Sequence, residues 1–404
     1  MKIHVKRDAE PVTAKHGPAF PLHWRDEVKE QLDQDVRLGI LEKVPVRTPV
    51  KWLHRMHVVA KENGWPRRTV DLRTLNDHCL RETQHVSSPY KQARLIPSHT
   101  WKTKTDCWNG YHSCALEEAD KDLTTFTREW GRYRYRAVPQ GFVASGDGYN
   151  QRYDRIIEGV ERKVRQVDDV ALWDDIGDME THWWRIIEYL ELLGCSGLVM
   201  NPEKFDFCQR EINFAGFVVT EEDVRPPQSI LQSISEFPTP TNISDVRYWF
   251  GLINQVGHYS QLGGLMKPFK DLLSPKTQFR WDEAFHTSKM KIVAMIAEGV
   301  KIFDPHRTTV LSPDWSRSGI GYWLFQKHCG CPSKIMTCCT DGWRPTLAHS
   351  WFLSKAEENY WPTEGEALAV AWALEDTKFY PRVSRPPYPD RPQAIGELAG
   401  DEAP

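Results

Sequence analysis

The stretch Val167-Asp168-Asp169-Val170 places two adjacent carboxylates inside a short apolar segment. A third aspartate, Asp106, lies 62 positions before Asp168. Adjacent carboxylates repel one another, and burying either of them without a counter-charge costs free energy. Such a pair at the tip of a strand-like segment is typical of a site for hard divalent cations, above all Mg²⁺, and two such ions about 4 Å apart catalyse nucleotidyl transfer. The three aspartates therefore predict a two-metal site.

Length and composition describe a folded protein of two or three domains. The chain has 404 residues, of which 40% are hydrophobic and 26% are charged. It has no apolar run long enough to span a membrane, and its first residues lack the apolar core of a signal peptide. The nine cysteines, an odd number, favour a reducing compartment, so we expect an intracellular, cytoplasmic protein. The net charge of −3 does not indicate nucleic-acid binding, which must depend on local clusters.

Hydrophobic periodicity predicts alternating strands and helices around the aspartates. We expect strands over residues 52–60, 68–72, 101–117, 124–138, 164–172 and 213–219, and helices over 24–41, 148–162 and 182–193, the last with Trp183, Ile187 and Leu190 on one face. The order strand, helix, strand–strand, helix, strand is similar to the split βαβ arrangement of palm-like sheets. Further along, residues 241–300 are predicted to be mostly helical, with Asn242 or Ser244 as the N-cap. A third unit is predicted to open with strands over 308–311 and 319–326.

Several motifs surround the aspartates in a fixed order. Arg67–Asn76 combines positive charge with a strand, Val138–Phe142 is a strand that ends in a polar turn, and Asn201–Lys204 follows a helix and its glycine stop. With these motifs, residues 20–380 resemble the reverse transcriptase of gypsy-like long-terminal-repeat retrotransposons and, more distantly, of retroviruses. Each motif alone is weak, but the ordered set is specific.

The resemblance implies a role for individual side chains. Asp106, Asp168 and Asp169 match the carboxylates that bind catalytic Mg²⁺ or Mn²⁺, and Lys204 matches a palm lysine that is a candidate proton donor. Three further residues match positions that contact the incoming deoxynucleoside triphosphate: Arg67 at the phosphates, Tyr111 under the sugar and Gln140 in the turn. The ordinary alternatives are solvated charges for Arg67 and Lys204 and a core aromatic for Tyr111.

The sequence departs from the family at one position. The usual box is Tyr-x-Asp-Asp, but Gln166 precedes Val167-Asp168-Asp169. The aspartates that carry the metals are retained, whereas the aromatic side chain that packs near the primer terminus is replaced. We therefore expect Gln166 to affect primer positioning or fidelity. A decayed or host-retained fragment that only binds nucleic acid is one alternative, and another palm-type two-metal nucleotidyltransferase is a second.

A second constellation resembles the start of a ribonuclease H domain. Asp314 lies in a strand-like segment and matches its first acid, and Glu366, preferred over Glu364, matches the second on a helix over residues 363–378. We expect the apolar face of this helix to consist of Ala367, Val370, Ala371 and Leu374. The sequence then runs into the proline-rich segment 381–389, with no matching strand or third acid, so we predict no useful ribonuclease H activity.

The resemblance sets the expected fold class and boundaries. We expect an α+β right-hand polymerase with fingers, palm and thumb, a split βαβ palm, and a truncated ribonuclease H-like α/β unit after it. The expected parts are a flexible lead-in (1–22), fingers and palm (23–220), thumb and connection (221–300), a partial ribonuclease H-like domain (301–380) and a disordered tail (381–404). The implied partners are an RNA or DNA template-primer and deoxynucleoside triphosphates, with no membrane, in the cytoplasm or in virus-like particles.

A cysteine cluster is left without a role by this interpretation. Cys329, Cys331, Cys338 and Cys339 lie within eleven residues. Thiolates are good zinc ligands, but Cys-x-Cys and Cys-Cys are not the usual knuckle spacing. Zn²⁺ binding and unpaired surface thiols both remain open, and the spacing favours the thiols.

The basic segment Arg128–Arg136 alternates arginine with aromatic residues, as a strand with one basic and one aromatic face would. Contact with the template backbone is one interpretation, and a structural strand is the one that we favour.

Overall fold

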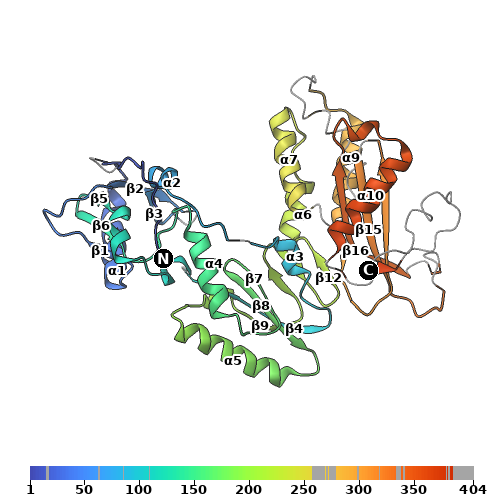
Figure 1. Ribbon diagram of the computed structural model, residues 1–404, viewed down its shortest axis with the longest axis horizontal. Helices are drawn as coiled ribbons and strands as arrows, with labels where there is room; N and C mark the ends of the chain where they lie inside the picture. Colours follow the sequence, from blue (N-terminus) through green and yellow to red (C-terminus); the bar gives the residue numbers. More distant parts are fainter. Residues whose placement is uncertain are drawn as a thin grey trace. The chain divides into compact units, whose positions relative to one another are not determined.

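The computed structural model describes residues 1–14, 18–61, 64–84, 86–108, 110–256, 269, 272, 279–297, 300–317, 319–333, 338–339, 342–378, 380 and 383–384. The chain divides into two compact units. The first contains residues 1–87, 105–170 and 180–206, and the second contains residues 88–104, 171–179 and 207–404. Both are drawn in Figure 1. None of the helices among the described residues is long and apolar enough to cross a membrane.

The first unit opens with a helix and a five-stranded sheet. A short 3₁₀ turn precedes α1 (Arg25–Arg37), whose Val28 and Leu32 are fully buried, as their four-residue spacing predicts. The sheet has the order β1-β6-β5-β2-β3. Its strands are β1 (Leu41–Lys43), β2 (His54–Ala60), β3 (Pro66–Asp71), β5 (Phe126–Arg128) and β6 (Gly131–Tyr135). The strands expected over residues 52–60 and 68–72 are present as β2 and β3, which pair antiparallel.

The arginines of β5 and β6 serve the structure of this sheet. Arg134 forms ion pairs with Glu42 and Asp122, both at 2.6 Å, and Arg132 donates to the carbonyl of Thr48 at 2.8 Å. Tyr133 is fully buried. The favoured structural interpretation of this basic and aromatic strand is therefore supported by its contacts.

The palm-like sheet has the order β7-β8-β4-β9, with α4 and α5 beside it (Figure 1). Its elements along the chain are β4 (Thr100–Asp106), α4 (Ser145–Ile156), β7 (Lys163–Gln166), β8 (Asp169–Asp175), α5 (Met179–Cys195) and β9 (Asp206–Gln209). The order strand, helix, strand–strand, helix, strand agrees with the prediction, but the last strand of this sheet is β9 rather than the expected strand over 213–219. The expected single strand over 164–172 is wrong, because it is two strands separated by a turn that contains Asp168. Likewise, the segment expected to be extended over 101–117 contains the 3₁₀ helix Gly110–Ser113 after Asp106. A second 3₁₀ helix, Glu118–Thr124, lies between it and the strand expected over 124–138.

Short elements complete this region and lead into the second unit. They are α2 (Arg73–Asp77), α3 (Pro89–Ala93) and a 3₁₀ turn over Pro202–Lys204. The predicted strand over 213–219 is a tight hairpin of β10 (Ile212–Phe214) and β11 (Phe217–Val219). Ala215 and Gly216 both have positive φ in its two-residue turn. A four-stranded sheet, β10-β11-β12-β13, is completed by β12 (Asp223–Arg225) and β13 (Val300–Lys301).

Residues 228–297 contain three described helices, α6 (Gln228–Ser235), α7 (Ile243–Val256) and α9 (Glu283–Ala297). Asn242 is the N-cap of α7, because its Oδ1 accepts from the backbone N–H of Asp245 at 3.0 Å. The rings of Trp249 and Phe285 both lie close to that of Phe269, at centroid distances of 5.0 and 5.4 Å. Much of the rest of the expected helical region lies outside the described residues.

The C-terminal part is a sheet with the order β16-β15-β14-β17, and α10 packs on β14 and β15 (Figure 1). The elements are β14 (Thr309–Ser316), β15 (Gly319–Lys327), β16 (Trp343–Phe352), α10 (Pro362–Thr377) and β17 (Val383–Ser384). β17 pairs in parallel with β14. The expectation that no strand follows α10 is therefore wrong, although only two residues of that strand are described. The expected tail beyond residue 384 lies outside the described residues.

Two helices bury faces other than the predicted ones. In α5 the buried residues are His182, Ile186, Tyr189 and Leu193, whereas Trp183 is 49% exposed. In α10 they are Gly365, Ala369, Ala373 and Thr377, whereas Leu374 is 52% exposed. Both helices carry apolar residues on neighbouring faces, so the pattern alone does not decide which face packs.

Candidate active site

The structure brings Asp106 and the Asp168–Asp169 pair together in the first unit. Asp106 is the last residue of β4, Asp169 is the first residue of β8, and Asp168 lies in the turn before it. The backbone N–H of Cys107 donates to the carbonyl of Asp168 at 3.3 Å, which joins the two strand ends. The convergence predicted from sequence is therefore present.

Lys204 reaches the same place from the 3₁₀ turn Pro202–Lys204. Its Nζ donates to Oδ2 of Asp106 at 2.9 Å. Two hydrogen bonds of Asn201 position the turn that carries Lys204. The side chain of Asn201 caps the turn by accepting from the N–H of Glu203, and the N–H of Asn201 donates to the carbonyl of Asp106 at 2.9 Å. The hydrogen bond to Asp106 raises the pKa of Lys204, and the charges of the three aspartates reinforce this.

Asp168 is a half-buried carboxylate that lies close to the other two aspartates. Burial raises its pKa, and the carboxylates of Asp106 and Asp169 raise it further. A hydrogen bond from the Tyr149 hydroxyl would oppose this rise in pKa, but that hydroxyl makes no hydrogen bond among the described residues. Oδ1 of Asp168 is buried and accepts no hydrogen bond within the described part of the chain. A buried, unpaired carboxylate oxygen costs free energy, so the site is arranged for a positively charged ligand.

These side chains fit divalent metal ions. Three carboxylates from two strand ends supply hard oxygen donors, which Mg²⁺ and Mn²⁺ prefer. Oδ1 of Asp168, which has no hydrogen-bond partner among the described residues, is available as a ligand atom. Asp106, Asp168 and Asp169 are accordingly the residues that would hold the ions.

A layer of buried tyrosines lies beside the carboxylates. Tyr149, Tyr153 and Tyr189 are at most 1% exposed, and the hydroxyls of Tyr153 and Tyr189 are 2.9 Å apart. Gly110 lies directly against Tyr149, because a Cβ at this position would come within 2.4 Å of the tyrosine ring. The ring of Tyr111 is 5.4 Å from that of Tyr149. Sequence analysis assigns no role to these tyrosines, although the four-residue spacing of Tyr149 and Tyr153 on α4 indicates one buried face.

Arg165 holds the turn that carries the aspartate pair. It donates to the carbonyl of Val167 at 2.7 Å and to Oδ1 of Asn150 at 2.9 Å, and it lies over the ring of Tyr153. Val167 has φ of +56°, which is unfavourable for a β-branched residue and requires such support. Arg165 was not recognised in the sequence, since nothing in the pattern distinguishes it from a solvated charge.

The remaining predicted residues occupy different places. Tyr111 lies at the site, because Asp168 is one of the groups that raise its pKa, after burial. Arg67 on β3 and Gln140 after Val138 are both exposed. Asn76 joins their segments, since it donates to the carbonyl of Gly141 and accepts from the N–H of Val143, both at 2.9 Å. Within the described residues, no contact joins Arg67 or Gln140 to the carboxylates.

Gln166 is half-buried at the end of β7. Its Oε1 is buried and has no hydrogen-bond partner among the described residues. The amide oxygen of Gln166 therefore lies where no described residue donates a hydrogen bond to it, which costs free energy. The resemblance implies an aromatic ring at this position.

The two acids of the second constellation lie on neighbouring elements. Asp314 is exposed on β14, and Glu366 is half-buried on α10. α10 touches β14 closely, because a Cβ at Gly365 would come within 2.1 Å of the Trp315 ring. Glu364 accepts from the N–H of Trp361 at 2.9 Å and so caps α10. Its use as a cap supports the choice of Glu366 as the second acid.

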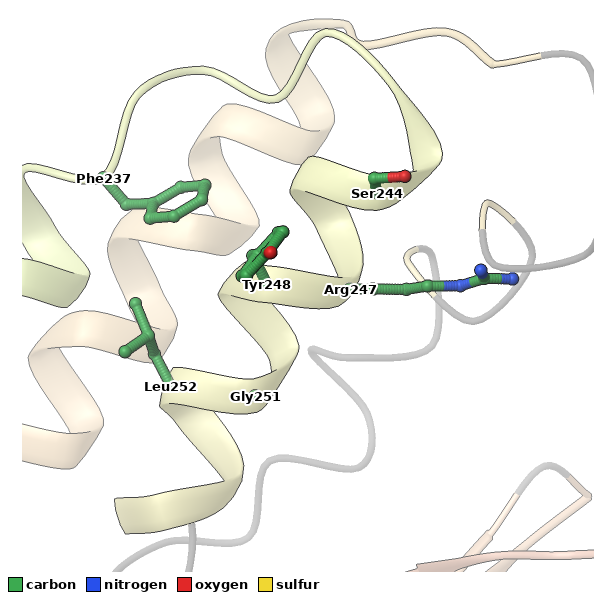
Figure 2. Close-up of a pocket in the computed structure, with 6 residues that line it drawn as sticks. All are labelled: Phe237, Ser244, Arg247, Tyr248, Gly251 and Leu252. Atoms are coloured by element: carbon green, nitrogen blue, oxygen red, sulfur yellow. The ribbon is translucent and has the colours of Figure 1, made fainter. Parts of the chain in front are cut away.

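A shallow groove of about 540 Å³ lies along α7 in the second unit. Figure 2 shows Phe237, Tyr248 and Leu252 on one side of it, and Arg247 extends away from them. Tyr248 is 73% exposed. The groove contains none of the predicted catalytic residues, and its aromatic and basic lining resembles a surface for stacking or backbone contact rather than for chemistry.

The fold and the arrangement of the site resemble those of a palm-type polymerase, and comparisons with known proteins agree on the fold. Residues 59–219 match the family described as "Reverse transcriptase (RNA-dependent DNA polymerase)", and residues 304–383 match the "RNase H-like domain found in reverse transcriptase". These two regions of the chain are thus identified as a reverse transcriptase domain and an RNase H-like domain.

Relatives along most of the chain are Pol polyproteins. The chain is 26% identical over 401 residues to that of transposon opus and 23% identical over 386 residues to that of transposon gypsy, both from Drosophila melanogaster. It is 22% identical over 390 residues to the transposon Tf2-3 polyprotein of Schizosaccharomyces pombe. These matches cover 94%, 91% and 93% of this chain, but only 38%, 36% and 28% of the relatives. The chain thus spans well under half the length of the curated relatives it matches.

Solved structures agree on the fold. The chain is similar to a foamy viral protease-reverse transcriptase dRH in complex with dsDNA, with a TM-score of 0.77 at 17% identity. It is also similar to the foamy viral protease-reverse transcriptase in complex with dsDNA, with a TM-score of 0.74 at 16% identity. The matches cover 94% and 93% of this chain and 66% and 78% of those chains. The expected right-hand polymerase fold followed by a ribonuclease H-like unit is confirmed.

Proposed function

We propose that this chain is an RNA-directed DNA polymerase that extends a primer by two-metal nucleotidyl transfer. The observation that carries the proposal is the convergence of Asp106 and Asp168 at two adjacent strand ends, where Oδ1 of Asp168 is buried and has no hydrogen-bond partner among the described residues. The match of residues 59–219 to the reverse transcriptase family supports it. The proposed parts are fingers and palm (23–220), thumb and connection (221–300) and a partial ribonuclease H-like domain (301–380).

Each residue of the site has a proposed role. Asp106, Asp168 and Asp169 would hold Mg²⁺, which when bound activates the primer 3′-hydroxyl and stabilises the departing pyrophosphate. Lys204 holds Asp106 in place through its 2.9 Å hydrogen bond and has a raised pKa, so it remains protonated and able to give up a proton late in the reaction. Tyr111 lies beside Asp168, where a ring under the sugar discriminates against a 2′-hydroxyl.

Arg67 and Gln140 are proposed to bind the nucleotide from the other side. Both are exposed, and the Asn76 hydrogen bonds hold their segments together. A guanidinium is permanently charged and offers several donors in a plane, which suits a triphosphate. The partners proposed for the chain are therefore a template-primer of RNA or DNA and deoxynucleoside triphosphates. The solved neighbours in complex with dsDNA and with an RNA/DNA hybrid support the first of these.

Primer extension tests the proposal. The purified 404-residue chain, with Mg²⁺, an RNA template and a DNA primer, is expected to add deoxynucleotides in the order that the template dictates. An Asp106→Asn variant is expected to add none. Addition without regard to template, or equal use of ribonucleotides, would instead indicate another palm-type nucleotidyltransferase.

One observation favours a second candidate, a non-catalytic fragment that binds nucleic acid. Gln166 leaves a buried acceptor unpaired beside the aspartate pair. Binding of a template-primer without any extension, at any concentration of Mg²⁺ or Mn²⁺, is the result that this candidate predicts.

For the ribonuclease H-like unit we propose that the activity is lost. Asp314 and Glu366 match two acids of a ribonuclease H site, but β17 (Val383–Ser384), which follows α10 and pairs with β14, carries no acid. We expect the purified chain to leave the RNA strand of a hybrid intact under conditions in which it extends a primer. Specific cleavage of that strand would contradict this.

A further inference from the structure

The four cysteines that have no part in the polymerase site gather at the end of one hairpin. β15 and β16 are antiparallel partners, and residues 328–342 connect them. Cys329 and Cys331 follow β15 directly, and Cys338 and Cys339 come shortly before β16. The antiparallel pairing thus brings the two ends of the connection, and with them two pairs of thiols, to the same place.

The four sulfur atoms form one compact group. All lie within 4.8 Å of one another. Sγ of Cys329 is 3.3 Å from that of Cys331 and 3.5 Å from that of Cys338, and Sγ of Cys339 is 3.7 Å from that of Cys331. Zn–S bonds of about 2.3 Å in a tetrahedron place sulfurs about 3.8 Å apart. The observed spacing is close to that of a tetrathiolate site, and all four cysteines are free thiols rather than disulfides.

The backbone around the group is fixed at both ends. The N–H of His328 donates to the carbonyl of Gly342 at 2.7 Å, and the N–H of Gly342 donates to the carbonyl of Cys339 at 3.1 Å. A Cβ at Gly342 would lie 2.9 Å from Sγ of Cys329 and 3.4 Å from that of Cys338. Only glycine leaves room for the sulfurs at this point. The Nζ of Lys327 donates to the carbonyls of Cys331 and Ser333 and so holds the first arm.

We propose that Cys329, Cys331, Cys338 and Cys339 bind one structural Zn²⁺ ion that closes the β15–β16 hairpin. Zinc is the metal that four thiolates in a closed tetrahedral arrangement select. Binding replaces the four S–H protons, which pass to solvent, with four Zn–S bonds and involves no change in oxidation state. The ion stabilises the connection, which has few apolar residues to pack, as a cross-link between its two arms. This site is independent of the polymerase chemistry.

Metal analysis of the full-length chain tests the proposal. The protein is purified with reductant and without chelator, dialysed against Zn²⁺ and then against metal-free buffer, and its zinc is measured by mass spectrometry. One zinc per chain is expected. Replacement by Co²⁺ is expected to give the intense visible bands and the thiolate charge-transfer absorption of a tetrahedral tetrathiolate complex. Removing the metal with a chelator is expected to lower the melting temperature, since the ion binds only the folded hairpin.

Matched cysteine variants separate the site from general thiol binding. Cys331→Ser and Cys339→Ser are each expected to lose most of the zinc and the tetrahedral cobalt spectrum. Cys195→Ser, which removes an exposed thiol outside the group, is expected to retain both. The proposal would be overturned if the fully reduced wild-type chain held no zinc and gave no tetrahedral cobalt spectrum. It would also be overturned if the Cys331→Ser and Cys339→Ser variants kept the full zinc content. The wild-type measurement does not depend on whether a variant folds.

Discussion

The ammonium of Lys204 donates a 2.9 Å hydrogen bond to Oδ2 of Asp106, which lies 98 positions earlier in the chain. This contact joins the end of β4 to the 3₁₀ turn Pro202–Lys204. It gives one of the three carboxylates a permanent counter-charge, whereas Oδ1 of Asp168 has no hydrogen-bond partner within the described residues. The ammonium thus compensates part of the charge of the three aspartates, and bound metal ions would compensate the rest.

Replacing Lys204 tests its part in the reaction. We expect Lys204→Ala to lower the turnover number by a factor of about 10²–10³, as is typical when a proton donor is lost. We expect Lys204→Arg, which keeps the charge, to lose less. The measurement is single-nucleotide incorporation under saturating primer and nucleotide. Because the Lys204 side chain is 55% exposed, the melting temperature should change little. Turnover equal to that of the parent would show that the lysine is an ordinary solvated charge.

The contact between Gly110 and Tyr149 gives a prediction on stability. A methyl group at Gly110 meets the tyrosine ring at 2.4 Å, and both residues are buried. We expect Gly110→Ala to destabilise the fold by roughly 1–3 kcal/mol and to reduce activity more than stability, because the ring also supports Tyr111. Denaturant unfolding and primer extension measure the two effects.

Gly146→Ala is the matched control for that variant. Gly146 lies in α4 with nothing within 4 Å of a new Cβ, so alanine is expected to be neutral or stabilising by up to about 1 kcal/mol. If both alanine variants unfold at the same denaturant concentration, the close contact between Gly110 and Tyr149 does not contribute to stability.

Gln166 offers a gain-of-function test. We expect Gln166→Tyr to increase the length of products per binding event, because it removes an unpaired buried acceptor and supplies the ring that packs near the primer terminus. Gln166→Leu is the control that removes the amide without supplying the ring. Processivity is measured with a trap that captures released enzyme. Shorter products from the tyrosine variant than from the parent would show that glutamine is adapted to this site.

The ion pair of Asp147 with Arg81 predicts how stability depends on pH. Asp147 is 6% exposed and accepts from Arg81 at 2.6 and 3.1 Å and from the N–H of Gln84 at 3.1 Å. The Arg81 hydrogen bond lowers the pKa of Asp147. Because the pKa is lower in the folded state, this stabilisation is fully present above the unfolded value of about 4 and is lost as pH falls through the folded value.

The corresponding variant is Asp147→Asn. At pH 7 we expect it to be less stable than the parent by about 1–3 kcal/mol, with the difference shrinking as pH falls below about 4. Urea unfolding at a series of pH values measures this. Asp8→Asn, at an exposed position, is the control and should follow the parent throughout. A difference between Asp147→Asn and the parent that stays constant down to low pH would argue against the ion pair as its source.

The sequence predicts the order of elements around the aspartates better than it predicts their packing. The strand and helix order of the palm follows from local periodicity, and the convergence of Asp106 with Asp168 follows from that order. The buried face of α5 does not, because Trp183 and Ile186 are both apolar and only tertiary contact decides that Ile186 is the buried one. The role of Arg165 was also beyond the sequence, since it depends on the positive φ of Val167 and on the position of Asn150.

The rate of single-nucleotide incorporation by Asp168→Asn tests the central claim most directly. The variant keeps the size of the side chain but removes the charge that would bind metal. Asp175→Asn, at the exposed last position of β8, the strand that begins directly after Asp168, is its control. We predict that the Asp168 variant binds template-primer and unfolds like the parent but incorporates no measurable nucleotide, while the control incorporates at the parental rate. Incorporation by Asp168→Asn at the parental rate would contradict the account.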